Sequence, residues 1–139
     1  MRSLNEVRIS GTIPRDADVK HFDSGARVAN FSLTVDRTQR ANDFPEFKAW
    51  DEVADAIKEH GKPGRIIFVD GRLQTDLFPD KNAPAPTNGD KQKMRKATYV
   101  VAKHVRIVDE KSGQTIIEVE ATKRDENQQA EPDAEPAVV

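Results

Sequence analysis

The chain of 139 residues contains no cysteine, which excludes both a disulfide framework and a thiolate metal site. Its three histidines, His21, His60 and His104, are widely separated and do not have the spacing of a metal cage. We therefore expect no metal and no other cofactor. The absence of cysteine also fits a reducing compartment.

Long apolar runs are missing as well. Residues 1–6 lack the apolar core of a signal peptide, and no later segment has the length needed to span a bilayer. We expect a soluble cytoplasmic protein that does not bind membranes.

The sequence also lacks a recognisable catalytic constellation. It has no cysteine nucleophile, no His-x-x-x-His pair and no Asp-x-Asp motif other than Asp16-Ala17-Asp18, which we interpret as part of a surface loop. We therefore do not expect an enzyme.

Acidic and basic residues are unevenly distributed along the chain. Residues 1–112 carry 20 basic and 17 acidic side chains, a net charge of +3, whereas residues 113–139 carry two basic and seven acidic ones, a net charge of −5. The net charge of −2 therefore conceals a basic body and an acidic end. Such an end is equally well explained as a means of keeping the protein in solution.

Hydrophobic patterning predicts an all-β protein. The segments with period-two alternation or β-branched composition are 7–13, a short piece at 19–22, 28–37, 44–50, 65–78, 97–108 and 115–120. A helix is predicted over 51–60, with Val53, Ala54 and Ile57 on one face, acids in its first turn and Gly61 at its end. Gly71 inside a strand indicates a bulge or bend.

Polar segments separate these elements. Residues 38–43 are predicted to form a loop, and the proline-containing segment 79–89 is predicted to form a mobile one. Residues 123–139 are acidic and aperiodic, which predicts a disordered tail. The expected fold is a five-stranded Greek-key barrel of the oligonucleotide-binding (OB) type. It has one short helix between strands three and four, and the domain covers residues 1–122, including an extra C-terminal strand.

Three segments carry a resemblance to a known family. They are NEVRISG at 5–11, GARVANFSL at 25–33 and VDGRLQT at 69–75, and they resemble hallmark segments of bacterial-type single-stranded DNA-binding proteins. The resemblance covers residues 2–108 in the same order, apart from a shortened region before the helix. It implies sequence-independent binding and protection of single-stranded DNA during replication, recombination and repair, at the nucleoid.

The resemblance also implies a binding site and partners. Bases would stack on Phe44, Trp50, Phe78 and Phe47, since stacking on aromatic rings is worth about 1–3 kcal/mol per base. Phosphate contacts would come from cations around the proposed groove: Arg2, Arg8, Arg37, Arg40, Lys48, Arg72, Lys91, Lys93 and Arg95. The family implies a homo-oligomer, with a tetramer favoured and strand 115–120 as a candidate to clasp a neighbour. Replication or repair proteins would bind the acidic tail.

Some aromatic residues allow more than one interpretation. Trp50 and Phe47 could instead cover the core beneath the helix, whereas Phe31 and Phe68 are predicted to pack inside the barrel. The roles of Phe22 and Tyr99 stay open.

The chain departs from the family in three places. Residues 74–78 lack the cations that commonly follow Leu73, Arg40 stands near a position that is often aromatic, and the C-terminus lacks a terminal aromatic. Weaker binding with a shallower salt dependence is therefore expected. The alternative function is an oligomerisation or protein-docking barrel, similar to primosomal accessory proteins, with weak or no nucleic-acid binding.

Overall fold

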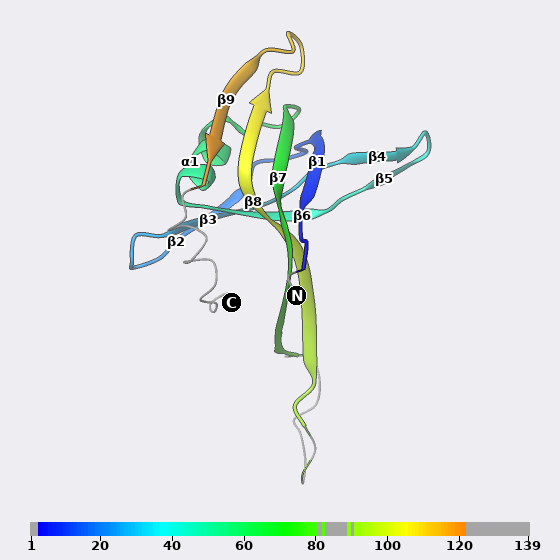
Figure 1. Ribbon diagram of the computed structural model, residues 1–139, viewed down its shortest axis with the longest axis vertical. Coiled ribbons are helices and arrows are strands. Elements are labelled where there is room, and N and C mark those ends of the chain that lie inside the picture. The colour runs from blue at the N-terminus through cyan, green and yellow to red at the C-terminus, as the bar shows by residue number, and fades with distance from the viewer. Residues whose placement is uncertain (1–2, 81, 83–88, 90, 122–139) are drawn as a thin grey trace.

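The computed structural model describes residues 3–80, 82, 89 and 91–121 (Figure 1). Its single helix within this part is α1 (Asp51–His60). The strands are β1 (Val7–Thr12), β2 (Asp18–His21), β3 (Arg27–Ser32), β4 (Val35–Thr38), β5 (Ala41–Asp43), β6 (Glu46–Trp50), β7 (Ile66–Pro79), β8 (Met94–Val108) and β9 (Thr115–Glu120).

Five strands, β1, β3, β6, β7 and β8, form a barrel. The main sheet has the order β1-β7-β8-β6-β3-β2, in which β6 pairs with β8 in parallel and the other neighbours are antiparallel. Backbone hydrogen bonds in both directions between Thr12 and Thr34 join β1 to the chain just after β3, and so close the barrel. Because α1 lies between the third and fourth barrel strands, this arrangement confirms the predicted OB-type architecture.

The long strands β7 and β8 bend at Gly71. The pairing register shifts between Asp70 and Gly71, and a side chain at Gly71 would overlap the Val101 carbonyl oxygen. A glycine is required here because the two backbones approach so closely. The bulge lets the far halves of β7 and β8 leave the barrel as an arm, which Figure 1 shows below the rest of the molecule.

The core fills the barrel and the space beneath α1. From the strands, Phe31, Phe47 and Ile67 are buried, and from the helix Val53, Ala54 and Ile57 are fully buried. This confirms the predicted inward face of the helix and the packing role of Phe31. Burial of these side chains is the main favourable contribution to folding.

Two secondary-structure predictions were wrong. Segment 28–37 is not one strand, because the chain turns out of the sheet at the fully buried Leu33 and pairs with Thr12 at Thr34. Segment 38–43 is not a loop, because β4 and β5 form a hairpin that projects from the barrel in Figure 1. Polar composition concealed this hairpin, since both faces of a projecting hairpin are in water and no apolar alternation is needed.

The C-terminal strand is confirmed, and it pairs with β8 of the same chain. The turn before it contains Gly113, whose φ of 76° favours glycine. The predicted disordered tail and most of the predicted loop 79–89 lie outside the described residues, as does Arg2.

Candidate nucleic-acid interface

The outward face of β6 forms a strip that begins at Phe44, just before the strand. Along β6, Phe47 and Ala49 point into the core, where they are 1% and 0% exposed. Side chains alternate along a strand, so Glu46, Lys48 and Trp50 point outward. Phe44 precedes them and is 63% exposed. The outward strip, from Phe44 to Trp50, spans roughly 20 Å at the usual rise per residue.

Lys48 lies at the centre of this outward strip and is held by neighbours on both sides. Its Nζ donates a hydrogen bond of 3.0 Å to Oδ1 of Asn30, the residue opposite it on β3. The same Nζ lies 5.0 Å from the centroid of the Tyr99 ring on β8. An ammonium over an aromatic face is attracted by the ring quadrupole. Lys48 is therefore fixed in position with its charge toward the outer face.

Tyr99 on β8 connects this surface to β7 through its hydroxyl group. Its hydroxyl donates to Oδ2 of Asp76 at 2.5 Å and accepts a hydrogen bond of 2.9 Å from Nε2 of Gln74. Burial and the hydrogen bond to Asp76 raise the pKa of Tyr99 far above its ordinary value. The phenol therefore stays neutral in the folded protein, and its ring forms a rigid wall beside Lys48.

The other end of the outward strip is set by Trp50, whose ring stacks on Phe22 with centroids 5.9 Å apart. Trp50 is also the N-cap residue of α1, so the start of the helix fixes the position of its backbone. Part of the indole is exposed, which leaves a ring surface available for a base.

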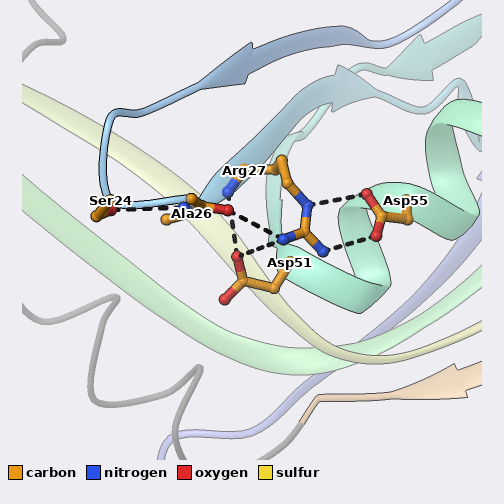
Figure 2. Close-up of polar contacts among 6 residues, drawn as sticks. Ser24, Ala26, Arg27, Asp51 and Asp55 are labelled. Carbon is orange, nitrogen blue, oxygen red and sulfur yellow. Dashed lines mark hydrogen bonds and ion pairs between the residues drawn. The ribbon is translucent and has the colours of Figure 1, made fainter.

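A network around Arg27 fixes the start of the helix (Figure 2). The Arg27 guanidinium donates two hydrogen bonds to Asp55, at 3.1 and 2.6 Å, and its backbone N–H donates to Asp51 at 3.1 Å. The hydrogen bond to Asp55 is the main reason that the pKa of Arg27 is raised. Asp51 has a φ of 51°, a conformation that aspartate tolerates better than most residues. The network thereby ties Trp50 to β3.

The arm carries a second aromatic and cationic pair. Phe78 on β7 is 40% exposed and lies opposite Arg95 on β8, whose guanidinium carbon is 6.0 Å from the ring centroid. Residues opposite each other in an antiparallel pair share a face, and Phe78 and Tyr99 have the same parity along the arm. Lys91 and Lys93 are exposed and lie on the segment that leads into β8.

The other cations predicted to contact phosphates, Arg8, Arg37, Arg40 and Arg72, lie on several different strands and turns. Arg8 forms an ion pair of 3.0 Å with Asp70, and Arg37 forms one of 3.5 Å with Asp43. Arg40 is exposed at the turn of the β4–β5 hairpin. Arg72 lies opposite Val101 in the β7–β8 ladder and lowers the pKa of Tyr99 slightly, against the larger raising effects. The structure therefore places Lys48, Arg72 and Arg95 beside aromatic residues of this face, whereas Arg8 and Arg37 are paired with carboxylates.

Two predictions about aromatic residues were wrong. Phe47 was predicted to stack on bases, but its ring stacks on Phe31 inside the barrel, with centroids 5.2 Å apart. Phe68 was predicted to pack in the core, but it is 38% exposed, and the Arg106 guanidinium carbon lies 4.3 Å from its ring centroid. It lies between the buried Ile67 and Val69, so alternation turns it outward.

Two residues of this face could not be assigned from the sequence. Phe22 supports Trp50, and Tyr99 supports Lys48. The contact between Asn30 and Lys48 could not be predicted either, because it depends on the β3–β6 register.

The described residues contain neither a membrane-spanning helix nor a metal cage. In that part of the chain, no helix is long and apolar enough to cross a bilayer. No group of three or more histidine, aspartate or glutamate side chains there is arranged to hold a metal ion.

Comparisons with known proteins agree with this geometry. The model of the single-strand binding protein family matches residues 4–108. Single-stranded DNA-binding protein 1 of Synechocystis is 33% identical over 88 residues, covering 60% of this chain and 73% of that protein. The single-stranded DNA-binding protein of Oceanobacillus iheyensis is 32% identical over 117 residues, covering 80% of this chain and 67% of that protein.

A solved structure shares the fold. The structure described as the Plasmodium falciparum SSB complex with ssDNA superposes with a TM-score of 0.64 at 21% sequence identity. The match covers 78% of this chain and 98% of the other.

Proposed function

Since the chain belongs to the single-strand binding protein family, we propose that it binds and protects single-stranded DNA through the outward strip of β6 and the arm formed by β7 and β8. The observation that carries this proposal is the position of Lys48. Its ammonium is held by Asn30 and Tyr99 between the exposed ring of Phe44 and the half-buried Trp50. Alternating rings and cations match a strand of bases and phosphates.

Stacking explains why a single strand would be preferred to a duplex. The faces of bases in a duplex are covered by their neighbours, whereas unpaired bases can turn toward Phe44 and Trp50. Every base has such a face, so binding by stacking and phosphate contact is largely independent of sequence. The acidic side chain of Asp76 on this face is held by Tyr99 and Gln74. The negative charge of Asp76 on the proposed binding face supports the expectation of weaker DNA binding with a shallower salt dependence.

One titration tests the proposed function. The chain has a single tryptophan, so its fluorescence reports on Trp50 alone. We expect a single-stranded oligonucleotide to quench it and high salt to weaken the effect, while a duplex of equal length gives little change. An absence of salt-sensitive binding to single strands would refute the proposal and favour the oligomerisation or docking barrel.

We also propose a homo-oligomer, with a tetramer favoured. Strand β1 ends the main sheet, and on the outer face beside it the exposed Phe68 and Arg106 offer an amphipathic contact. Light scattering should give a mass above that of the monomer, and Phe68→Glu should lower it. A monomeric mass for the unaltered protein would refute this proposal.

We propose further that the protein acts at the nucleoid in the cytoplasm, and that its role is binding rather than catalysis.

Residues 123–139 would form an acidic tail that recruits replication or repair proteins, outside a binding domain of residues 1–122. A variant that ends at residue 122 should keep its affinity for single strands and lose such partners. Unchanged partner binding by that variant would contradict the role of the tail.

A further inference from the structure

A shallow hollow lies where β6 begins, at one end of the outward strip. It is lined by Pro14, Arg15, Ser32, Phe44 and Glu46. The lining thus combines an aromatic ring, a guanidinium, a hydroxyl and a carboxylate. These groups come from the connection after β1, the end of β3 and the start of β6.

The barrel closure holds these segments together. Ser32 and Glu46 are the last directly opposite pair of the β3–β6 ladder, so their side chains share the outer face. The Leu33 N–H donates to the Pro45 carbonyl at 3.3 Å and continues the ladder past them. Ile13, just before Pro14, donates its N–H to the Arg65 carbonyl at 3.0 Å. The hollow therefore rests on a fixed backbone.

The polar groups of the hollow are available to a ligand. Among the described residues, no hydrogen bond or ion pair engages the side chains of Arg15, Ser32 or Glu46. Arg8 and Arg37, by contrast, each have a carboxylate partner. Phe44 leaves 63% of its surface exposed at the same place.

A carboxylate on a phosphate-binding face needs a ligand group that can donate to it. Glu46 repels phosphates, so its favourable contact with DNA is with a hydrogen-bond donor on a base edge. Glutamate accepts from the N4 amino group of cytosine, whereas the corresponding group of uracil or thymine is a carbonyl acceptor. Ser32 can act as donor or acceptor beside it.

We propose that this hollow is a nucleobase subsite that favours bases with an exocyclic amino group. The base stacks on Phe44, its amino group donates to Glu46, and Arg15 binds an adjacent phosphate. This subsite rests on the proposed binding of single-stranded DNA and adds a base preference to it. The remaining stacking positions stay indifferent to sequence.

The experiment compares oligomers of deoxycytidine and deoxyuridine of equal length. Uracil is used in place of thymine because neither uracil nor cytosine carries the C5-methyl group of thymine. We expect the unaltered protein to bind the deoxycytidine oligomer about threefold to tenfold more tightly. Glu46→Gln should bring this ratio close to one, because an amide can accept from an amino group and also donate to a carbonyl. The matched control Glu120→Gln removes the same charge from β9 and should leave the ratio unchanged.

Two more variants divide the roles within the hollow. Phe44→Ala should weaken binding of both oligomers and reduce the ratio, because the base is no longer held beside Glu46. Arg15→Gln should weaken both equally and keep the ratio, because phosphates are common to both oligomers.

Each outcome of this experiment is decisive. Equal affinity of the unaltered protein for the two oligomers, a ratio that survives Glu46→Gln, or an equal loss in Glu120→Gln would overturn the subsite while leaving DNA binding intact. Binding of neither oligomer would overturn the proposed function itself, and the subsite with it.

Discussion

The Nζ atom of Lys48 lies 5.0 Å from the centroid of the Tyr99 ring, across the short parallel junction of β6 and β8. The two residues are 51 positions apart in the sequence, and only the closed barrel brings them together. The hydrogen bond of 3.0 Å to Asn30 holds the same ammonium from the other side. A lysine held in this way is positioned for a phosphate before DNA arrives, so less side-chain entropy is lost on binding.

Substitution of the exposed Phe44, just before β6, and of the buried Phe47, within β6, should separate DNA affinity from stability. Phe44→Ala should weaken DNA binding by about 1–3 kcal/mol, with a change in unfolding free energy within about 0.5 kcal/mol. Phe47→Ala should instead lower the unfolding free energy by about 3–5 kcal/mol, because it leaves a cavity in the core. Anisotropy of a labelled oligonucleotide and urea unfolding measure the two quantities. A large loss of stability in Phe44→Ala would place that ring in the core.

Lys48 and Arg95 should each contribute to the salt dependence of binding. For a single strand, each phosphate that a cation neutralises adds about 0.7 to the slope of log K against log salt. We therefore expect a shallower slope for Lys48→Gln and for Arg95→Gln. Lys58→Gln, on the exposed side of α1, is the matched control and should keep the slope. Identical slopes in all four proteins would remove both residues from the interface.

Tyr99 should make the protein less stable in alkali. Its folded pKa is raised above the ordinary value of 10.0, so the folded state holds the proton more tightly than the unfolded state does. The stabilisation is fully present below about pH 10 and is lost as the pH rises further. We expect the unfolding free energy to fall above that pH, and Tyr99→Phe to lessen the fall.

The titration of Tyr99 can be followed directly. It is the only tyrosine in the chain, so tyrosinate absorbance reports on this residue alone. The absorbance should rise in the native protein only at a pH well above that of the urea-unfolded chain. Coincident titration curves in the two states would contradict the raised pKa.

Asp51 should tolerate asparagine much better than valine. Its φ of 51° suits asparagine, which can also accept the hydrogen bond from the Arg27 N–H through its amide oxygen. Valine is β-branched and has no acceptor, so Asp51→Val should cost about 2–4 kcal/mol of unfolding free energy from strain and the lost bond. Denaturant unfolding of the two variants checks this difference. Equal losses would show that neither the backbone conformation nor the acceptor matters.

Much of the fold could be predicted from local pattern. Helix α1 was predicted over its full length because apolar spacing, acids in the first turn and a terminal glycine all indicated the same element. The bend at Gly71 was predicted because a glycine inside an otherwise regular strand often marks a bulge or a close approach of two backbones. The β4–β5 hairpin could not be predicted, since its side chains are largely polar and face water on both sides.

The site could be predicted only in part. The sequence singled out Phe44, Trp50, Phe78 and Lys48 as candidate ligands of DNA, through their chemistry and the family resemblance. It did not distinguish the outward Phe68 from the inward Phe47. Phe68 lies in an apolar run without alternation, and the direction of Phe47 depends on where β6 begins.

By itself, then, the sequence determined the elements, their order and the chemical groups available to a nucleic acid, because these depend on composition and on neighbours along the chain. The tertiary structure alone decided which groups meet. Closure of the barrel placed Tyr99 under Lys48, and the β3–β6 register set Ser32 beside Glu46 at the hollow. These contacts join strands far apart in sequence, and a shift of register by one residue would turn each side chain to the opposite face.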